Sequence, residues 1–351
     1  MLKQELIDAV KGGKPIVDGV DLSDGDYQGV DLGGGSFESV NFSRANLSGA
    51  KLKECNFINC TFSNAKLDGA NLILANFIEA EANGMSLVGC DLRLANFVDS
   101  KLAESDFSNT NLENTNFVNS VLAGAKFLGC KINQSSFINA DLSKTSWAGS
   151  TAFRVNFLEP LVEAINLDEV QWELPFFMKA NFAGFDFTKV GFIKPQFQQC
   201  DLSDTNFSNK DLSQAGFMQA KLTSANFSGA ILAQANLVEA DLSFANFENA
   251  NMPQALLKEA ILTKVNFTKI KAEQALFEKA DCTGSVFSGA DLTYVEFSHA
   301  ILDEADMSNT SLYRTNLHEI QEQKTNWKGA SRKLALETDE TKLKAEQWAA
   351  K

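Results

Sequence analysis

Histidine, proline and tyrosine are scarce in this sequence, and the shortages exclude several classes of protein. His299 and His318 are the only histidines among 351 residues, too few for a histidine-built metal centre or a catalytic triad. No apolar run approaches the roughly 20 residues that cross a bilayer. Residues 1–13 lack the apolar centre of a signal peptide. We therefore expect a soluble, cytoplasmic protein that has no membrane partner.

Cations are also in short supply. Lysine and arginine number 31 and aspartate and glutamate 45, so the formal net charge is −14. Proteins that hold a phosphate backbone do so with lysine and arginine. The sequence therefore predicts no direct binding of nucleic acid.

The abundant feature is a repeat of five residues. The sixty positions from Leu22 to Leu317 whose numbers end in 2 or 7 carry large apolar side chains, except for Ala82, Ala152, Ala272 and Cys282. These positions hold 24 of the 28 phenylalanines. The residue two places earlier is mostly small, and the one between is often Asn or Asp. Because five matches neither the helical period of 3.6 nor the strand period of 2, the chain is expected to turn a corner every five residues.

This pattern resembles the pentapeptide-repeat family over about residues 18–330. The resemblance implies an all-β fold, a right-handed quadrilateral β-helix with four repeats per coil. A spacing of twenty is visible in the sequence itself as a ladder of ten phenylalanines: Phe37, Phe57, Phe77, Phe97, Phe117, Phe137, Phe157, Phe177, Phe197 and Phe217. Each is expected to stack inside the helix on its equivalent in the next coil.

The ends and the middle depart from the repeat. We expect a capping helix within residues 1–17, regular coils over 18–157, irregular coils over 158–197, regular coils over 198–330 and a helical tail over 331–351. The N-terminal helix is predicted over Leu2–Val10. The second helix, about Thr338–Ala350, either caps the last coil or pairs two chains. In the middle, Pro160, Pro175 and Pro195 indicate distorted coils or, alternatively, a short helix that starts at Pro160.

Catalytic chemistry finds no support in the sequence. All six cysteines fall on inward positions without a CxxC pair, which is typical of small buried apolar residues. The two histidines fall on outward positions without carboxylate or cysteine partners at ligand spacing. The glycine runs at 12–13 and 33–35 lack the lysine of a phosphate loop. We predict no enzyme, no cofactor and no metal.

One outward column is apolar. On the side of the phenylalanine ladder, the residue after the large one should face solvent, yet it is apolar in seven successive coils. With the neighbouring Phe176, the predicted protein-binding residues are Ile58, Ile78, Val98, Val118, Ile138, Leu158 and Met178. Phe153, if outward, would extend them. The column is either an interface or the ordinary preference of strands for branched residues.

Two functions follow from the resemblance. Some family members resemble duplex DNA and bind DNA gyrase as dimers. Here the net charge of −14 over a repeat on the order of 70 Å long is sparse beside one charge per about 1.7 Å of duplex. Residues 1–175 hold 23 acids and 13 bases, so such mimicry would fall to that half.

The segments SLYRTNLHE and TDETKLKAEQW resemble the termini of bacterial family members associated with type VI secretion clusters. The favoured interpretation is a non-enzymatic scaffold that binds a protein partner, with a homodimer also open. In its sharpest form it is an adaptor for secreted effectors.

Overall fold

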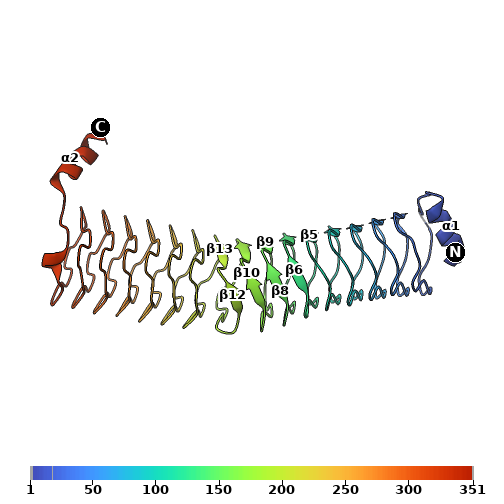
Figure 1. Ribbon diagram of the computed structural model, residues 1–351, viewed down its shortest axis with the longest axis horizontal. Coiled ribbons are helices and arrows are strands. Elements are labelled where there is room, and N and C mark those ends of the chain that lie inside the picture. The colour runs from blue at the N-terminus through green and yellow to red at the C-terminus, as the bar shows by residue number, and fades with distance from the viewer. Residues whose placement is uncertain (1–2, 18, 350–351) are drawn as a thin grey trace. The chain divides into compact units, whose positions relative to one another are not determined.

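The computed structural model describes residues 3–17 and 19–349, and the chain divides into two compact units. The N-terminal unit comprises residues 1–180 and 190–192, and the C-terminal unit residues 181–189 and 193–351. Met1, Leu2, Asp18, Ala350 and Lys351 lie outside the described residues, so those ends of the predicted segments have no structural counterpart here. Each unit consists of stacked coils, coloured blue to green and yellow to red in Figure 1.

Each coil takes twenty residues and pairs in parallel with its neighbours. In the N-terminal unit Asn41 bridges to Thr61, and Asn46 bridges to Lys66. The amide of Phe42 donates to the Thr61 carbonyl at 2.7 Å, and the amide of Thr61 donates to the Val40 carbonyl at 3.0 Å. Equivalent bridges recur at every fifth residue in both units. The quadrilateral β-helix predicted from the repeat is thus confirmed.

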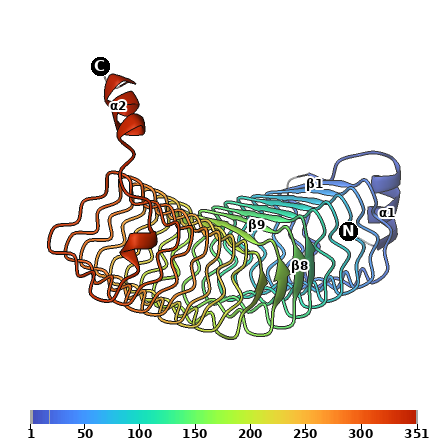
Figure 2. The same ribbon diagram turned by 60° about the vertical axis from the view of Figure 1, so that its left-hand side comes forward.

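The N-terminal unit contains most of the strands that exceed a single bridge. One parallel sheet runs in the order β1-β2-β3-β4-β5-β7-β9-β11, and another contains β10, β8 and β6 in that order. Figure 2 shows the first sheet along one side of the unit, from β1 to β9, and β8 on another. The strands are β1 (Ser36–Glu38), β2 (Asn56–Ile58), β3 (Asn76–Ile78), β4 (Asn96–Val98), β5 (Asn116–Val118), β6 (Lys131–Asn133), β7 (Ser136–Ile138), β8 (Thr151–Phe153), β9 (Asn156–Leu158), β10 (Gln171–Glu173), β11 (Phe176–Met178) and β12 (Gly191–Ile193), whose last residue belongs to the C-terminal unit.

Stacked rings fill the interior, as the ladder predicts. Phe97, Phe117 and Phe137 are fully buried, and successive ring centroids lie 4.8 Å apart in nearly parallel planes. A second column, which contains Phe107 and Phe127, meets this ladder edge to face. Because offset stacking and edge contacts both suit the ring quadrupole, phenylalanine fills this space better than tyrosine, whose hydroxyl would need a partner.

The middle of the chain keeps its register. Phe177 pairs with Phe157 and Trp172 with Ala152, twenty residues apart, so no residue is inserted between these coils. From 158 to 197, strands and turns follow one another, and no helix begins at Pro160. Each of the three buried prolines lies two residues after the end of a three-residue strand. At the turn-type corners the small residue donates to the carbonyl three places back, as Ala45 does to Phe42, and proline lacks that N–H.

Different devices cover the two ends of the repeat. At the start of the N-terminal unit, helix α1 (Lys3–Lys11) buries Leu6 completely. At the end of the C-terminal unit, after β13 (Gln196–Gln198) and coils joined by single bridges, Arg332 in the 3-10 helix η1 (Arg332–Leu334) makes two short bonds to Glu322. The Arg332 guanidinium also lies 4.5 Å from the centroid of the Trp327 ring. Helix α2 (Glu340–Ala349) follows, and none of the described helices is long and apolar enough to cross a membrane.

All six cysteines are buried, as their inward phase predicts. Burial raises the pKa of Cys55 and Cys90 to about 12 and that of Cys60 and Cys130 to about 11. Because the thiolate is the reactive form, these side chains act as small apolar residues at neutral pH.

Candidate protein-binding face and histidine cluster

The predicted apolar column is a continuous feature of the N-terminal unit. Each member is the third residue of a strand in the first sheet, and the strands hold them in register, so that Ile58 pairs with Ile78 and Val98 with Val118. We call this column the apolar stripe: Ile58, Ile78, Val98, Val118, Ile138, Leu158 and Met178.

The stripe is less exposed than the sequence suggests. All seven side chains are half-buried, because each stacks on its equivalents in the coils on either side. Phe176, the first residue of β11, is also half-buried but pairs with Asn156, one column away from the stripe. Phe153 does not extend the stripe, since it belongs to β8 in the other sheet and lies under the guanidinium of Arg154.

An asparagine ladder borders the stripe on one side. The side-chain amides of Asn76, Asn96 and Asn116 each donate to the side-chain oxygen of the asparagine one coil earlier, at 2.8–2.9 Å. The ladder satisfies these half-buried groups internally and holds the bordering surface neutral. The stripe therefore has a polar border on this side, and that border is rigid.

The opposite border carries three acids among its seven residues, the others being Asn59, Asn119, Asn139 and Lys179. The residues that follow the stripe in sequence include Glu79, Asp99 and Glu159, which we call the acidic edge, and all three are exposed. Lys179 pairs with Glu159 at 2.6 Å. Among the described residues no ion pair neutralises Glu79 or Asp99, and nearby Lys101 bonds to Glu81 at 2.6 Å. The stripe thus has a neutral border on one side and, beside Ile78 and Val98, two acids on the other.

Two exposed leucines beside this face were missed in the sequence. Leu74 and Leu94 are 39% and 46% exposed, and both hold a positive φ of 61°. They precede Asn76 and Asn96 by two residues, so they lie across the asparagine ladder from Ile78 and Val98. The feature of the sequence that could have identified these leucines is a bulky apolar residue at a corner where the adjacent coils carry Glu54 and Asn114.

Strand chemistry alone does not account for the stripe. Strands β6, β8 and β10 form a parallel sheet of the same kind, and their third residues are Asn133, Phe153 and Glu173. A three-residue strand in this fold therefore accepts polar and charged residues at that position. The uninterrupted apolar column requires another reason.

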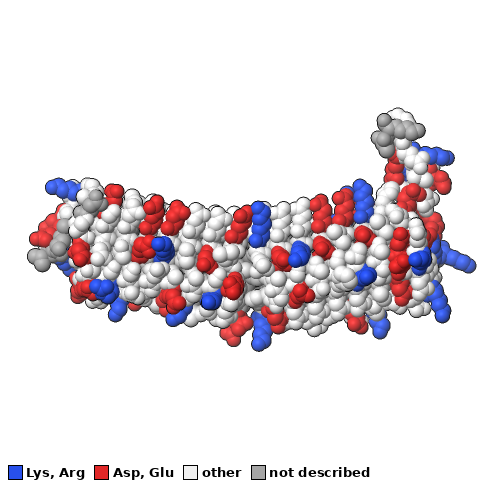
Figure 3. All heavy atoms as spheres, turned by 180° about the vertical axis from the view of Figure 1, so that it is seen from behind, with Lys and Arg blue, Asp and Glu red and all other residues white. Residues whose placement is uncertain are grey.

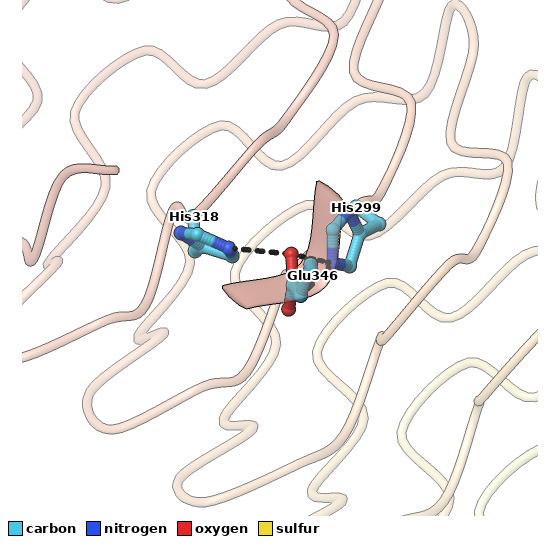
Figure 4. A group of neighbouring side chains, drawn as sticks. All are labelled: His299, His318 and Glu346. Carbon is cyan, nitrogen blue, oxygen red and sulfur yellow. Dashed lines mark hydrogen bonds and ion pairs between the residues drawn. The ribbon is translucent and has the colours of Figure 1, made fainter. Parts of the chain in front are cut away.

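The two histidines lie together in the C-terminal unit, where Glu346 of α2 reaches both (Figure 4). Nε2 of His318 lies 3.1 Å from a carboxylate oxygen of Glu346, and Nε2 of His299 lies 3.3 Å from the same oxygen. Although outward in phase, His318 is only 1% exposed, because the segment leading into α2 and the helix itself lie over it. The expectation that neither histidine has a carboxylate partner was wrong, since the partner is distant in sequence.

These contacts tie α2 to the coils, and we call the cluster of His299, His318 and Glu346 the latch. The backbone amide of Asp339 donates to Nδ1 of His318 at 3.1 Å, so in the neutral ring Nε2 carries the proton and donates it to Glu346. A metal-bound histidine instead donates through its second nitrogen. The bond from His318 also lowers the pKa of Glu346, which favours the carboxylate.

Opposite charges are paired along the coils. Arg44 meets Asp24 at 2.6 Å, Lys101 meets Glu81 at 2.6 Å and Lys221 meets Asp201 at 3.1 Å, each pair separated by one coil. Figure 3 shows basic and acidic side chains interspersed on the face in view. These columns do not form a continuous line of unpaired negative charges like the phosphates of duplex DNA.

Family models match more than half of the chain. A model of pentapeptide repeats (8 copies) matches residues 18–57, 177–209, 200–237, 235–278 and 280–318, and a model of a pentapeptide repeat region matches residues 69–137. The protein is a β-helical repeat protein, and it belongs to the pentapeptide repeat family.

Solved structures include similar chains. HetL, a pentapeptide repeat protein involved in heterocyst differentiation regulation in Nostoc sp. strain PCC 7120, is 23% identical over 77% of this chain and 90% of its own, with a TM-score of 0.21. QnrB1, a plasmid-mediated fluoroquinolone resistance protein, is 19% identical over 66% of this chain and 96% of its own, with a TM-score of 0.31. No curated protein matches the sequence.

Proposed function

We propose that the protein is a non-enzymatic scaffold that binds a protein partner through the apolar stripe. The observation that carries the proposal is the seven-coil column of apolar residues in register, on a strand position that in the other sheet of the same unit also holds polar and charged residues. A contiguous apolar surface with a satisfied polar border is the anatomy of an interface.

The rigidity of the face supports this role. Its inner side rests on the phenylalanine ladder, and the asparagine amides are bonded to one another from coil to coil. A partner would therefore meet side chains that lose little freedom on binding, which lowers the entropic cost of association.

In its sharpest form the proposal is an adaptor for type VI secretion effectors that acts in the bacterial cytoplasm. It is supported only by the resemblance of the segments around residues 311–319 and 338–348. In the structure these segments form a late coil and the latched helix α2. A homodimer through the stripe is compatible with the same surface.

The alternative, mimicry of DNA toward a gyrase, is less favoured. Coil-to-coil ion pairs neutralise many of the acids, including Asp24 and Glu81. Inhibition of gyrase supercoiling by the purified protein, lost when the acids of residues 18–150 are removed, would replace the scaffold proposal with this one.

The test is the double variant Val98→Lys/Val118→Lys, with Val121→Lys as a matched control. Val121 is an exposed apolar residue outside the stripe. We expect the double variant to keep its circular-dichroism spectrum but to lose dimerisation or partner recovery, measured by light scattering and pull-down from the native cell. The control should behave as wild type. Unchanged assembly and unchanged recovery in the double variant would overturn the proposal.

A further inference from the structure

Leu74 and Leu94 place bulky apolar side chains at a corner of the coil, and the protein itself buries neither. A φ of 61° is unfavourable for a bulky side chain, and glycine and asparagine adopt it most readily. Both leucines are substantially exposed, so burial within the protein does not compensate for the strained backbone. The corner backbone does not require leucine, because Glu54 and Asn114 adopt the same positive φ at this corner of the adjacent coils. The exposed apolar side chains are therefore available to a partner.

The two leucines and the stripe form one apolar patch two coils wide. On one coil Leu74 and Ile78 lie on either side of Asn76, and on the next coil Leu94 and Val98 lie on either side of Asn96. Coils are spaced by about 4.8 Å. Apolar residues three or four apart on an α-helix lie about 5–6 Å apart. A helix laid across these coils could therefore place one apolar side chain over each.

The charges around this patch favour a partner with positive charge. Glu79 and Asp99 directly follow Ile78 and Val98 and are exposed on one border. Nearby cations are engaged, because Arg93 bonds to Asp91 at 2.7 Å and Lys101 bonds to Glu81. The described residues thus present two acids on this border and a neutral amide ladder within the patch. Lysine or arginine along one side of the partner would be complementary.

The protein itself contains a helix on the corresponding column of another coil. In the C-terminal unit Ser298 and His318 follow the inward Phe297 and Leu317, as stripe residues follow their phenylalanines. Lys342 and Glu346 of α2 contact them at 3.4 and 3.1 Å. The outer side of this ladder therefore accepts a helix without any change in the coils.

We propose that Leu74, Leu94, Ile78 and Val98, with Glu79 and Asp99, form a docking site for a cationic amphipathic helix of a partner protein. The inference rests on the proposed function and adds the chemistry of the partner. The leucines supply the contacts that bury apolar area, and the two acids set orientation and attraction at long range.

The experiment uses three fluorescent 18-residue helical peptides and the full chain. The first has leucine on one face and lysine along one side, the second has glutamate in place of lysine, and the third has serine in place of leucine. Fluorescence anisotropy at up to ~100 micromolar protein covers the affinity expected of a small helix interface. We expect the first peptide to bind and the other two to bind at least about tenfold more weakly.

The decisive variant is Leu74→Asn/Leu94→Asn, because asparagine suits a positive φ and should not weaken the fold. Peptide binding should fall at least about tenfold. The matched control is Phe244→Asn in the C-terminal unit, a residue that is 56% exposed with a φ of 63°, and it should leave binding unchanged. Glu79→Gln/Asp99→Asn should reduce both binding and its salt dependence, whereas Glu239→Gln/Glu259→Gln should not.

The inference is overturned if no peptide binds, if the glutamate peptide binds as well as the lysine peptide, or if Leu74→Asn/Leu94→Asn binds as wild type. Its failure is separable from that of the scaffold role. If the lysine peptide fails while Val98→Lys/Val118→Lys still loses its natural partner, only the partner chemistry is wrong. If the peptide depends on the leucines while that variant keeps its partner, the helix site stands and the role of the wider stripe fails.

Discussion

The face that carries the phenylalanine ladder has different solvent-facing residues in the two units. Its inward residues are large and apolar in both, as with Phe117 and Phe297. Its outward residues form the apolar stripe in the N-terminal unit. In the C-terminal unit they are Gln198, Met218, Val238, Lys258, Glu278, Ser298 and His318, the last two contacted by α2.

The difference separates two kinds of constraint. An inward position must fill a fixed volume between neighbouring coils, so its residue is dictated by the fold. An outward position has no such requirement, and the C-terminal unit shows that polar, charged and apolar residues all serve there. Uniformity at an outward position is therefore informative about binding, whereas uniformity at an inward position is informative about stability.

The largest expected effect tests the inward half of this comparison. Phe117→Ala and Phe297→Ala each remove a fully buried ring that stacks on its neighbour at 4.8 and 4.9 Å. Each should lower the free energy of unfolding by about 3–5 kcal/mol, measured by urea denaturation of the full chain. A neutral result in either unit would show that the interior there is not close-packed.

A smaller effect is expected in the irregular coils of the N-terminal unit. A Cβ at Gly191 would lie 2.2 Å from the carbonyl oxygen of Val170, and a backbone atom cannot move aside as a side chain can. Gly191→Ala should destabilise by about 1–3 kcal/mol. Gly149→Ala, where φ is +68° and nothing lies within 4 Å, is the comparison and should cost about 1 kcal/mol. Equal thermal shifts in the two variants would mean that these coils relax around the added methyl group.

The latch in the C-terminal unit should affect α2 alone. Glu346→Gln and His318→Gln each weaken the contact with the coils, so trypsin should cleave after Lys342 and Lys344 faster, while the unfolding of the coils is unchanged. Because the pKa of Glu346 is lowered from its ordinary value of 4.5, its contribution is complete above that pH. Protection of the tail, followed at low pH by amide hydrogen exchange because trypsin is inactive there, should be lost only as the pH falls below 4.5 toward the lowered pKa of Glu346. If wild type and both variants are equally protected, contacts other than those of His318 and Glu346 hold α2 against the coils.

The smallest effects are expected at outward positions. Val118→Lys in the stripe and Lys258→Val at the corresponding position of the C-terminal unit should each change stability by no more than about 0.5 kcal/mol, measured by thermal unfolding. A loss above 2 kcal/mol in Val118→Lys alone would mean that the stripe is part of the core of its unit. The contrast between the two units would then concern stability and not binding.

Local pattern was sufficient to predict the coil. Every fifth residue is apolar and, with four exceptions, large, and the phase is unbroken from Leu22 to Leu317, so the inward set could be read residue by residue. The stripe followed by counting one residue further. The half-burial of the stripe could not be predicted from the repeat, because the exposure of a side chain depends on how side chains of adjacent coils cover one another.

The surroundings of the stripe and of the latch depend on contacts that do not follow the five-residue period of the sequence. Leu74 and Leu94 could be numbered from the repeat, but their positive φ and their place beside the stripe emerge only when coils are stacked. Glu346 reaches His299 and His318 across 47 and 28 residues, after a tail that has left the repeat. A five-residue repeat determines a coil because each inward side chain packs against its equivalents twenty residues away along the chain. The tertiary structure alone decided where α2 lies, because nothing periodic links a tail helix to the coil it contacts.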